Sequence, residues 1–348
     1  TVRWRDGDDW AVIVGAPAAI ADAFAVAVRD FQTLGGPDRG RVFYASPQQP
    51  VIPSATRDEV SGIGRILGYT PTREALPIPP RDVPDGGLLP TQLLNAYNAT
   101  PLREEGYEGM GQTVVVFGFD GFVQNDMDQF ADSFGLPRFA PEVVGDMPQR
   151  RIGEATMDLQ VVHAIAPKAK LVLVNARSTT SNDGGGAFEK LGRLMESVDR
   201  QFPGAIWSFS IGWGCDRLFN AADLAPVRAA LAAALRNGTT AFDATGDLAG
   251  LECKGGHRWS EPPSPDDVGV DAIASLPEMT AVGGTKLSTD ADGRWLAEQS
   301  WYNIPVTLGT AGGASTLFAR PEWQTVGIGS ELPDRRLVPD ISAVGDPS

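Results

Sequence analysis

The sequence has few cysteines and few histidines, with two of each among its 348 residues. Two cysteines are too few for a disulfide scaffold and lack the spacing of a metal site, so they could form one bridge or remain two buried thiols. His163 falls in an apolar helical segment and is expected to pack in the core, whereas His257 falls in an irregular stretch. A Ser-His-Asp triad is therefore disfavoured, because it would need a well-placed histidine.

Positive charge and long hydrophobic runs are also scarce. The 29 Lys and Arg residues against 44 Asp and Glu residues give a net charge of −15, which argues against nucleic acid as a partner. No apolar run is long enough to predict a membrane-spanning segment. Glycine (40) and proline (27) are abundant instead, which predicts many tight turns. The length and ordinary composition predict a globular chain with two domains.

The first 68 residues predict a small α/β domain. An apolar strand followed by an amphipathic helix occurs twice, and the second helix would begin with a Thr-x-x-Glu capping box. Residues 69–88 are rich in proline and charge and show no periodicity, so they predict an exposed linker. The expected elements are strands at Trp10–Ala16 and Gly40–Ser46 and helices at Pro17–Phe31 and Thr56–Gly68.

Residues 89–348 predict a larger α/β domain. Nearly continuous apolar strands alternate with helices, which is typical of a parallel sheet covered on both faces. In such doubly wound sheets, ligands bind beyond the carboxyl ends of the strands. We expect strands at residues 112–119, 170–176, 205–212, 239–246 and 278–284, and helices at residues 125–135, 153–167, 186–202 and 223–238.

The helical segment 153–167 carries two acidic residues four positions apart, Glu154 and Asp158. On a helix these side chains share one face, where two like charges repel each other. A solvated surface would explain them, but the neighbouring residues are apolar and no Lys or Arg lies three or four positions from Asp158. Two close carboxyls in a partly buried site have pKa values that separate, so that one holds a proton. The pair is a candidate for proton transfer at acidic pH.

Asp247 follows the strand expected at 239–246 directly and is flanked by glycine-rich sequence. It could be a catalytic residue at the carboxyl edge of the sheet, or a turn residue that bonds its own backbone. Asp243, inside the strand, is assigned to structure. Two further glycine-rich segments would let an extended peptide approach the backbone closely, namely Ser210–Gly214 and Thr310–Ser315.

Seven segments occur in a recognisable order: "GQTVVVFGFDGFVQNDMDQFADSFGLP", "GEATMDLQVVHAIAPKAKLVLVNA", "SFSIGWG", "ATGDLAG", "MTAVGGT", "GGAS…FARPEWQ" and "RRLVPDISAVGDPS". Together they resemble the sedolisin family, the serine-carboxyl peptidases. The resemblance implies a subtilisin-like α/β fold for residues 89–348, with a doubly wound, mostly parallel sheet. Residues 1–68 resemble the C-terminal half of the family's propeptide, a partial ferredoxin-like α/β domain that assists folding and blocks the site.

The resemblance also implies a role for each acidic residue. Glu154 would be the general base that takes the proton of a nucleophilic serine, and Asp158 would orient and support it. Asp247 would lie in the oxyanion hole, where it must carry a proton to donate a hydrogen bond, so activity would require acidic pH. The substrate-binding residues implied by the family motifs are Ser210, Gly212, Trp213, Gly214, Gly312 and Gly313.

The family's nucleophilic serine lies in a Gly-Thr-Ser-x-x-x-Pro motif after the Pro-Asp-Ile segment, which places it beyond residue 348. The similar "GTAGGAS" has Ala311 where serine belongs and matches the family's glycine-rich loop better. The calcium that the family binds would also take its ligands from beyond residue 348, with none in this chain. We therefore expect a fragment, or one piece of a nicked enzyme in its pro-form (zymogen).

The resemblance further implies secretion, a disulfide between Cys215 and Cys253, and maturation within the linker at residues 69–88. Its partners would be a polypeptide substrate and its own propeptide. A hypothesis of another class is a catalytically inactive module that binds peptides in the same cleft. Absence of the Gly-Thr-Ser-x-x-x-Pro motif from the gene beyond Ser348 would favour that module.

Overall fold

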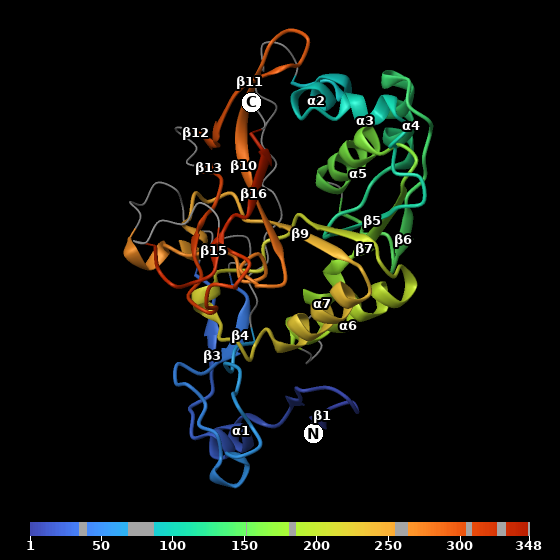
Figure 1. Ribbon diagram of the computed structural model, residues 1–348. Coiled ribbons are helices and arrows are strands. Elements are labelled where there is room, and N and C mark those ends of the chain that lie inside the picture. Colours follow the sequence, from blue (N-terminus) through green and yellow to red (C-terminus); the bar gives the residue numbers. More distant parts are fainter. Residues whose placement is uncertain are drawn as a thin grey trace.

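The computed structural model describes residues 1–34, 40–68, 87–150, 152–180, 186–254, 264–303, 308–325 and 332–346. Its centre is an eight-stranded sheet of order β11-β10-β9-β8-β5-β7-β6, in which β16 also pairs with β10. The pairs in this sheet are parallel, apart from β10 with β11. The structure is thus the subtilisin-like, mostly parallel α/β sheet that the sequence predicts (Figure 1).

The five strands expected in the sheet are confirmed, with slightly different ends. The sheet strands are β5 (Thr113–Gly118), β6 (Glu142–Val144), β7 (Lys170–Asn175), β8 (Ile206–Phe209), β9 (Thr240–Ala244), β10 (Thr280–Thr289), β11 (Trp295–Ser300) and β16 (Ile341–Val344). Shorter pairs are formed by β12 (Tyr302–Asn303) with β13 (Leu308–Gly309) and by β14 (Gly313–Ala314) with β15 (Leu337–Val338). The helices of this domain are α2 (Pro90–Ala96), α3 (Thr100–Glu104), α4 (Gln124–Phe134), α5 (Glu154–Ile165), α6 (Ala187–Gln201) and α7 (Ala225–Arg236).

Alternate residues of β5 supply two separate hydrophobic cores. Val115 and Phe117 are fully buried in the core that contains side chains of α6 and α7, whereas Val114 and Val116 join the core that contains side chains of α4 and α5. Burying each such side chain contributes about 1.5–3 kcal/mol. The helices therefore cover both faces of the sheet, and the carboxyl ends of β5, β7, β8 and β9 remain at one edge. Among the described residues, no helix is long and apolar enough to cross a membrane.

Residues 1–68 form a small α/β unit whose first helix is shorter than predicted. The helix α1 (Pro17–Phe24) ends at Ala25, which has a left-handed φ of 54°. The predicted helix continued to residue 31, but residues Arg29–Gln32 form β3, which pairs antiparallel with β4 (Val42–Ala45). The β-branched Val26 and Val28 favour extended chain at this point. The strand expected at 10–16 is reduced to β2 (Val12–Ile13), paired with β1 (Val2–Arg3).

The second helix predicted in this unit, Thr56–Gly68, is wrong. Within the described residues 40–68 only a short 3-10 turn forms, at Ser54–Thr56. Gly62 and Gly64 each disfavour a helix by about 1 kcal/mol. The chain instead runs beside β4, where the amide of Gly68 donates to the oxygen of Tyr44 at 2.8 Å.

The N-terminal unit lies against α6 and the loop after β8 (Figure 1). The amide of Arg65 donates to Asp223 at 2.7 Å, and its side chain donates to the oxygen of Leu218 at 3.0 Å. The predicted linker at 69–88 falls almost wholly outside the described residues. Three ion pairs join the first residues to α6: Arg3–Glu189 at 2.6 Å, Arg5–Glu196 at 2.8 Å and Asp8–Arg193 at 2.8 Å.

Candidate active site

Glu154 and Asp158 lie in the first two turns of α5 and are both partly exposed. The helix packs on the sheet through Leu159, which is fully buried. Met157 and Val161, two of the apolar residues that neighbour the acidic pair in the sequence, are exposed. The helix therefore keeps one face open, and the acidic pair lies on a helix that is only half covered.

The pKa of Asp158 lies well above that of an ordinary aspartate. Burial raises the pKa of Asp158 to about 7, a hydrogen bond with Ser210 opposes this, and the charge of Asp120 raises the pKa further. Ser210 directly follows β8, so the hydrogen bond connects α5 to the carboxyl edge of the sheet. Asp158 therefore holds a proton in acid, which is the behaviour predicted for one member of the pair.

Asp120 is a third carboxylate at this edge, and the sequence analysis missed it. It lies two residues beyond β5, is 2% exposed, and accepts hydrogen bonds from three backbone amides at the start of α5. An acidic residue directly after a fully apolar strand was the signal that could have identified it.

Asp247 lies beyond the carboxyl end of β9, the neighbour of β8. Its side chain is exposed, and its backbone oxygen accepts a hydrogen bond from the amide of Gly309 at 2.8 Å. The turn requires glycine at Gly246, where φ is +106° and a Cβ would lie 2.6 Å from Glu252. Glu252 is buried and accepts from the amide of Leu248 at 3.0 Å, so it supports the loop that carries Asp247. Nothing in the local sequence marked Glu252 for this role.

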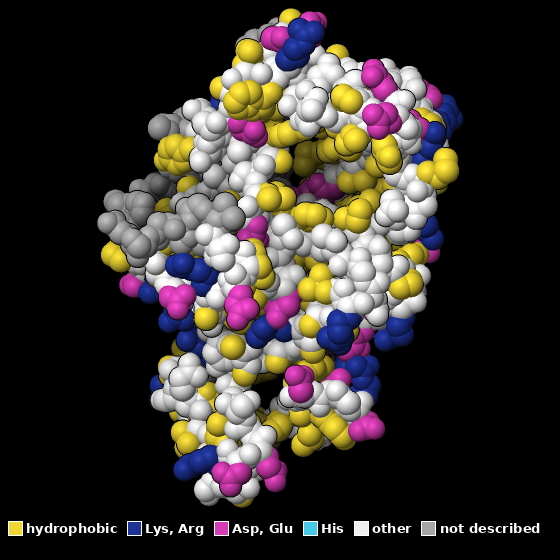
Figure 2. Space-filling view, viewed as in Figure 1, with side chains coloured by type: hydrophobic (Ala, Val, Ile, Leu, Met, Phe, Trp, Pro, Cys, Tyr) yellow, Lys and Arg dark blue, Asp and Glu magenta, His cyan; other side chains and the backbone are white. Residues whose placement is uncertain are grey.

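Ser210 thus lies near enough to Asp158 to act on its pKa, and Asp247 lies at the same edge, one strand further along the sheet. The space-filling view shows a hollow in the upper half of the molecule (Figure 2). Its walls are mainly hydrophobic, and acidic side chains lie in its depth. An edge with these properties can bind an extended peptide and move protons beside it.

The side chain of Trp213 packs in the core and holds the Ser210–Gly214 segment in place. The Trp213 side chain is fully buried and packs edge-on against Phe119, with ring centroids 5.5 Å apart. Its backbone amide donates to Asp271 at 2.6 Å. Trp213 therefore fixes the segment and is itself fully covered, whereas Gly212 keeps partial exposure.

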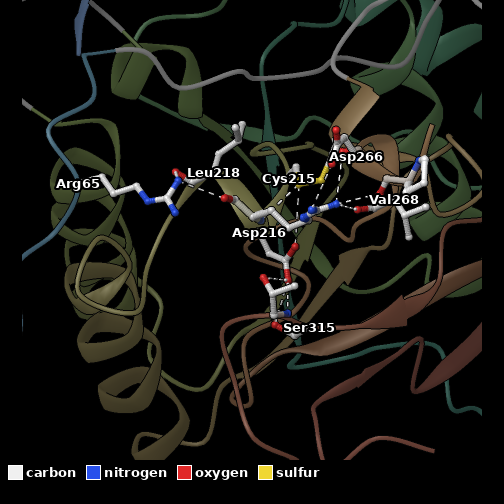
Figure 3. The surroundings of a disulfide bond; sticks show 11 residues. Arg65, Cys215, Asp216, Leu218, Asp266, Val268 and Ser315 are labelled. Atoms are coloured by element: carbon white, nitrogen blue, oxygen red, sulfur yellow. Dashed lines mark hydrogen bonds and ion pairs between the residues drawn. A yellow bond between two sulfur atoms is a disulfide. The ribbon is translucent and has the colours of Figure 1, made fainter. Parts of the chain in front are cut away.

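Cys215 and Cys253 are joined by a disulfide, with their Cα atoms 4.8 Å apart. The bridge connects the loop after β8 to the loop after β9. Asp216 beside it is fully buried and accepts from the Thr316 amide at 2.6 Å and the Ser315 hydroxyl at 3.2 Å (Figure 3). Burial raises the pKa of the Asp216 carboxyl. These contacts tie three loops at the carboxyl edge together.

Gly312 and Gly313 lie where two backbone segments approach closely. Gly313 pairs with Val338 in the β14–β15 ladder, and a Cβ on Gly312 would lie 3.1 Å from the oxygen of Val338. One edge of this glycine segment is therefore occupied by β15. A peptide strand could be added only along another edge.

The Pro-x-Trp-Gln and Arg-x-x-Pro-Asp motifs meet in one network. Arg336 is fully buried, pairs with Asp340 at 2.5 Å, and lies over the ring of Trp323 at 5.0 Å. The amide group of Gln324 donates to Asp340 at 3.2 Å. These residues hold β15 and β16 beside β10, so the motifs stabilise the fold around the site.

Among the residues with described structure, neither the histidine nor the candidate metal group adds a catalytic group. His163 is buried against Phe139 and bonds the oxygen of Pro137 at 2.7 Å, so it packs in the core as predicted. His257 lies outside the described residues. Within the part of the chain that the structure describes, the one group with metal-site geometry is Cys215, Asp216 and Cys253, and both sulfurs are used in the disulfide.

Comparison with known proteins agrees with the motifs. No protein-family model matches the chain. It is 29% identical to kumamolisin of Bacillus sp. (strain MN-32) over 267 residues, covering 70% of this chain and 44% of the relative. It is 25% identical to sedolisin of Pseudomonas sp. (strain 101), covering 94% of this chain and 56% of the relative. The chain therefore spans about half the length of the curated relatives it matches.

Comparison with solved structures indicates the same relatives as the comparison of sequences. A solved structure of Pseudomonas sedolisin, a serine-carboxyl proteinase complexed with two molecules of pseudo-iodotyrostatin, matches with a TM-score of 0.58 and 27% identity. The match covers 74% of this chain and 70% of that chain. The ordered motifs, the doubly wound sheet and these relatives together support the assignment of the chain to the sedolisin family.

Proposed function

We propose that the protein is a serine-carboxyl endopeptidase that hydrolyses polypeptides at acidic pH. The observation that carries this proposal is the pair Glu154 and Asp158 on α5, in which burial raises the pKa of Asp158 to about 7. The pair lies at the carboxyl edge of the sheet, where ligands of such folds bind. The relatives support peptide hydrolysis, because the matched sedolisin is a serine-carboxyl proteinase.

In the proposed reaction, Glu154 accepts the proton of a serine hydroxyl as the serine oxygen attacks the peptide carbonyl. Asp158 holds its own proton and supports Glu154, so the pair carries one negative charge. Protonated Asp247 donates a hydrogen bond to the oxyanion that forms. Glu154 then gives its proton to the leaving amine, and a water molecule releases the acyl group by the same route.

The proposal takes the nucleophilic serine from sequence beyond residue 348. Support comes from the Arg336–Asp340 segment, which resembles the family segment that precedes the nucleophile. The family's calcium is likewise proposed to bind outside these residues, and no step depends on it. Adding Ca²⁺ to the 348-residue chain should therefore leave its melting temperature unchanged. We also propose that the protein is secreted and that residues 1–68 act as a propeptide that inhibits the site.

Substitution of the pair tests the function in the protein expressed from its complete gene. Glu154→Gln and Asp158→Asn should each lower kcat/KM for an unstructured peptide by about 10²–10⁴-fold, the contribution of a positioned acid or base. Asp126→Asn, an exposed carboxylate of α4, is the control and should have no effect. Unchanged hydrolysis in Glu154→Gln would reject the mechanism.

A peptide-binding module without catalysis is the second candidate. Absence of a Gly-Thr-Ser-x-x-x-Pro motif from the gene beyond Ser348 would favour it, because no nucleophile would then be supplied. Such a module would bind an unstructured peptide without cleaving it. A native gene that encodes no such motif, together with binding but no hydrolysis, would support it over the peptidase.

A further inference from the structure

Asp120 has a position that the catalytic proposal does not yet use. Its carboxylate is 2% exposed and faces the N-terminus of α5. One oxygen accepts from the amide of Ala155 at 3.1 Å, and the other accepts from Ile152 at 3.3 Å and Gly153 at 3.2 Å. A residue 35 positions away in the sequence thus caps the helix that carries the acidic pair.

This cap replaces one that α5 cannot provide for itself. The cap position of the helix is Gly153, which has no side chain and a φ of 103°. The first amides of a helix need acceptors and carry partial positive charge, so a buried carboxylate is well suited to this position. The three amides flank Glu154, and their hydrogen bonds hold the turn from which its side chain projects.

The same carboxylate acts electrostatically on Asp158. Repulsion from Asp120 adds to the effect of burial on the pKa of Asp158. Among the described residues, Ser210 after β8 also acts on the pKa of Asp158, and Glu154 lies one turn away on the same helix. Among the elements packed on α5, α2 has no charged residue, and Lys170 of β7 pairs with Glu142. The three acidic residues of α4, Asp126, Asp128 and Asp132, do not contribute to the pKa of Asp158.

We propose that Asp120 is a positioning residue of the site, which fixes the first turn of α5 beneath Glu154 and places a negative charge beside Asp158. This role rests on the proposed function, since it matters to catalysis only if the pair moves protons. Its consequence is that Asp158 keeps its proton to higher pH and Glu154 is held in one orientation.

The test is the variant Asp120→Asn, which keeps the size of the side chain and removes its charge. The pKa of Asp158, followed by carboxyl ¹³C NMR in the 348-residue chain, should fall by about one unit. Amide exchange at Ile152 and Gly153 should accelerate about tenfold, because an amide side chain cannot accept all three bonds. The control variant Asp126→Asn should change neither the pKa of Asp158 nor the exchange rates of these amides. An Asp158 pKa that stays at the wild-type value would overturn the proposal.

The unaltered protein supplies a second measurement in case the variant does not fold. Val123 caps α4 without a side-chain hydrogen bond, so α4 is an internal control. Exchange of the Ala155 amide should be slower than that of Asn125, the equivalent residue in α4, and equal rates would overturn the capping role. Neither readout needs hydrolysis. If the complete protein cleaves no peptide while the Asp158 pKa still moves, the proposed function fails and this inference stands.

Discussion

At the scale of single residues, Asp243 in β9 shows how burial sets the pH response. Its carboxyl group is fully buried, and a hydrogen bond with the backbone of Ala244 compensates only partly for the loss of water. Burial, and then repulsion from Asp271, raise the pKa of Asp243 well above its ordinary value. The group therefore stabilises the fold below the ordinary aspartate pKa, and this contribution is lost as the pH rises through the raised pKa.

The variant Asp243→Asn should remove this pH dependence, since the amide cannot ionise. At neutral pH its free energy of unfolding should exceed that of the wild type by about 1–3 kcal/mol, whereas in acid the difference should shrink toward zero. Urea unfolding at both pH values measures this difference in the free energy of unfolding, and Asp126→Asn serves as the exposed control. An equal difference at the two pH values would contradict the account.

The sequence predicted some site residues and not others for a physical reason. Glu154 and Asp158 could be recognised because helical spacing puts them on one face, a local property of four residues. Asp120 and Glu252 could not, because each acts on backbone amides that only the folded chain brings near: Asp120 caps a helix 35 residues away. Trp213 was placed at the substrate surface by its motif, but its side chain is fully buried.

At the scale of elements, strands buried on both faces were predictable and exposed ones were not. The apolar run of β5 is almost fully buried, so its sequence carries a clear signal. The edge strand β11 is mostly exposed and has no such run. The helix expected at 56–68 failed because Gly62 and Gly64 weaken it and because pairing with β4 satisfies the backbone instead.

The attachment of the N-terminal unit should depend more on Asp223 than on the surface ion pairs. The Asp223 carboxylate accepts from the amides of Arg65 at 2.7 Å and Asn220 at 2.8 Å. Asp223→Ala should lower the free energy of local opening at Arg65 by about 1.5–3 kcal/mol. Glu189→Gln, which weakens the Arg3 pair, should cost less than about 1 kcal/mol. Hydrogen exchange of the Arg65 amide measures the effect of each variant on local opening. A larger effect of Glu189→Gln than of Asp223→Ala would refute the main role of Asp223.

At the scale of the whole molecule, several buried carboxyls act in one direction. Burial raises the pKa of Asp158 to about 7 and that of Asp223 to about 6, and it also raises the pKa values of Asp216 and Asp243. Each of these groups stabilises the folded chain in acid and loses that contribution as the pH rises through its folded pKa. Exposed carboxylates with lowered pKa values, such as Asp132, oppose this only weakly.

The melting temperature should therefore be highest at about pH 4–5 and fall toward about pH 8. The net charge of −15 adds repulsion at neutral pH and acts in the same direction. Calorimetric scans across this range measure the trend. A melting temperature that rises steadily to the alkaline end would show that the buried carboxyls do not govern stability.

The pH dependence of peptide hydrolysis tests the central claim most directly. For the protein expressed from its complete gene, kcat/KM should be highest in acid and collapse as the pH rises through about 7, where Asp158 ionises. Glu154→Gln should lower kcat/KM by about 10²–10⁴-fold at every pH, and this loss would exclude a contaminating peptidase as the source of the activity. Activity that stays constant up to about pH 8 would contradict catalysis by a proton-holding carboxyl pair.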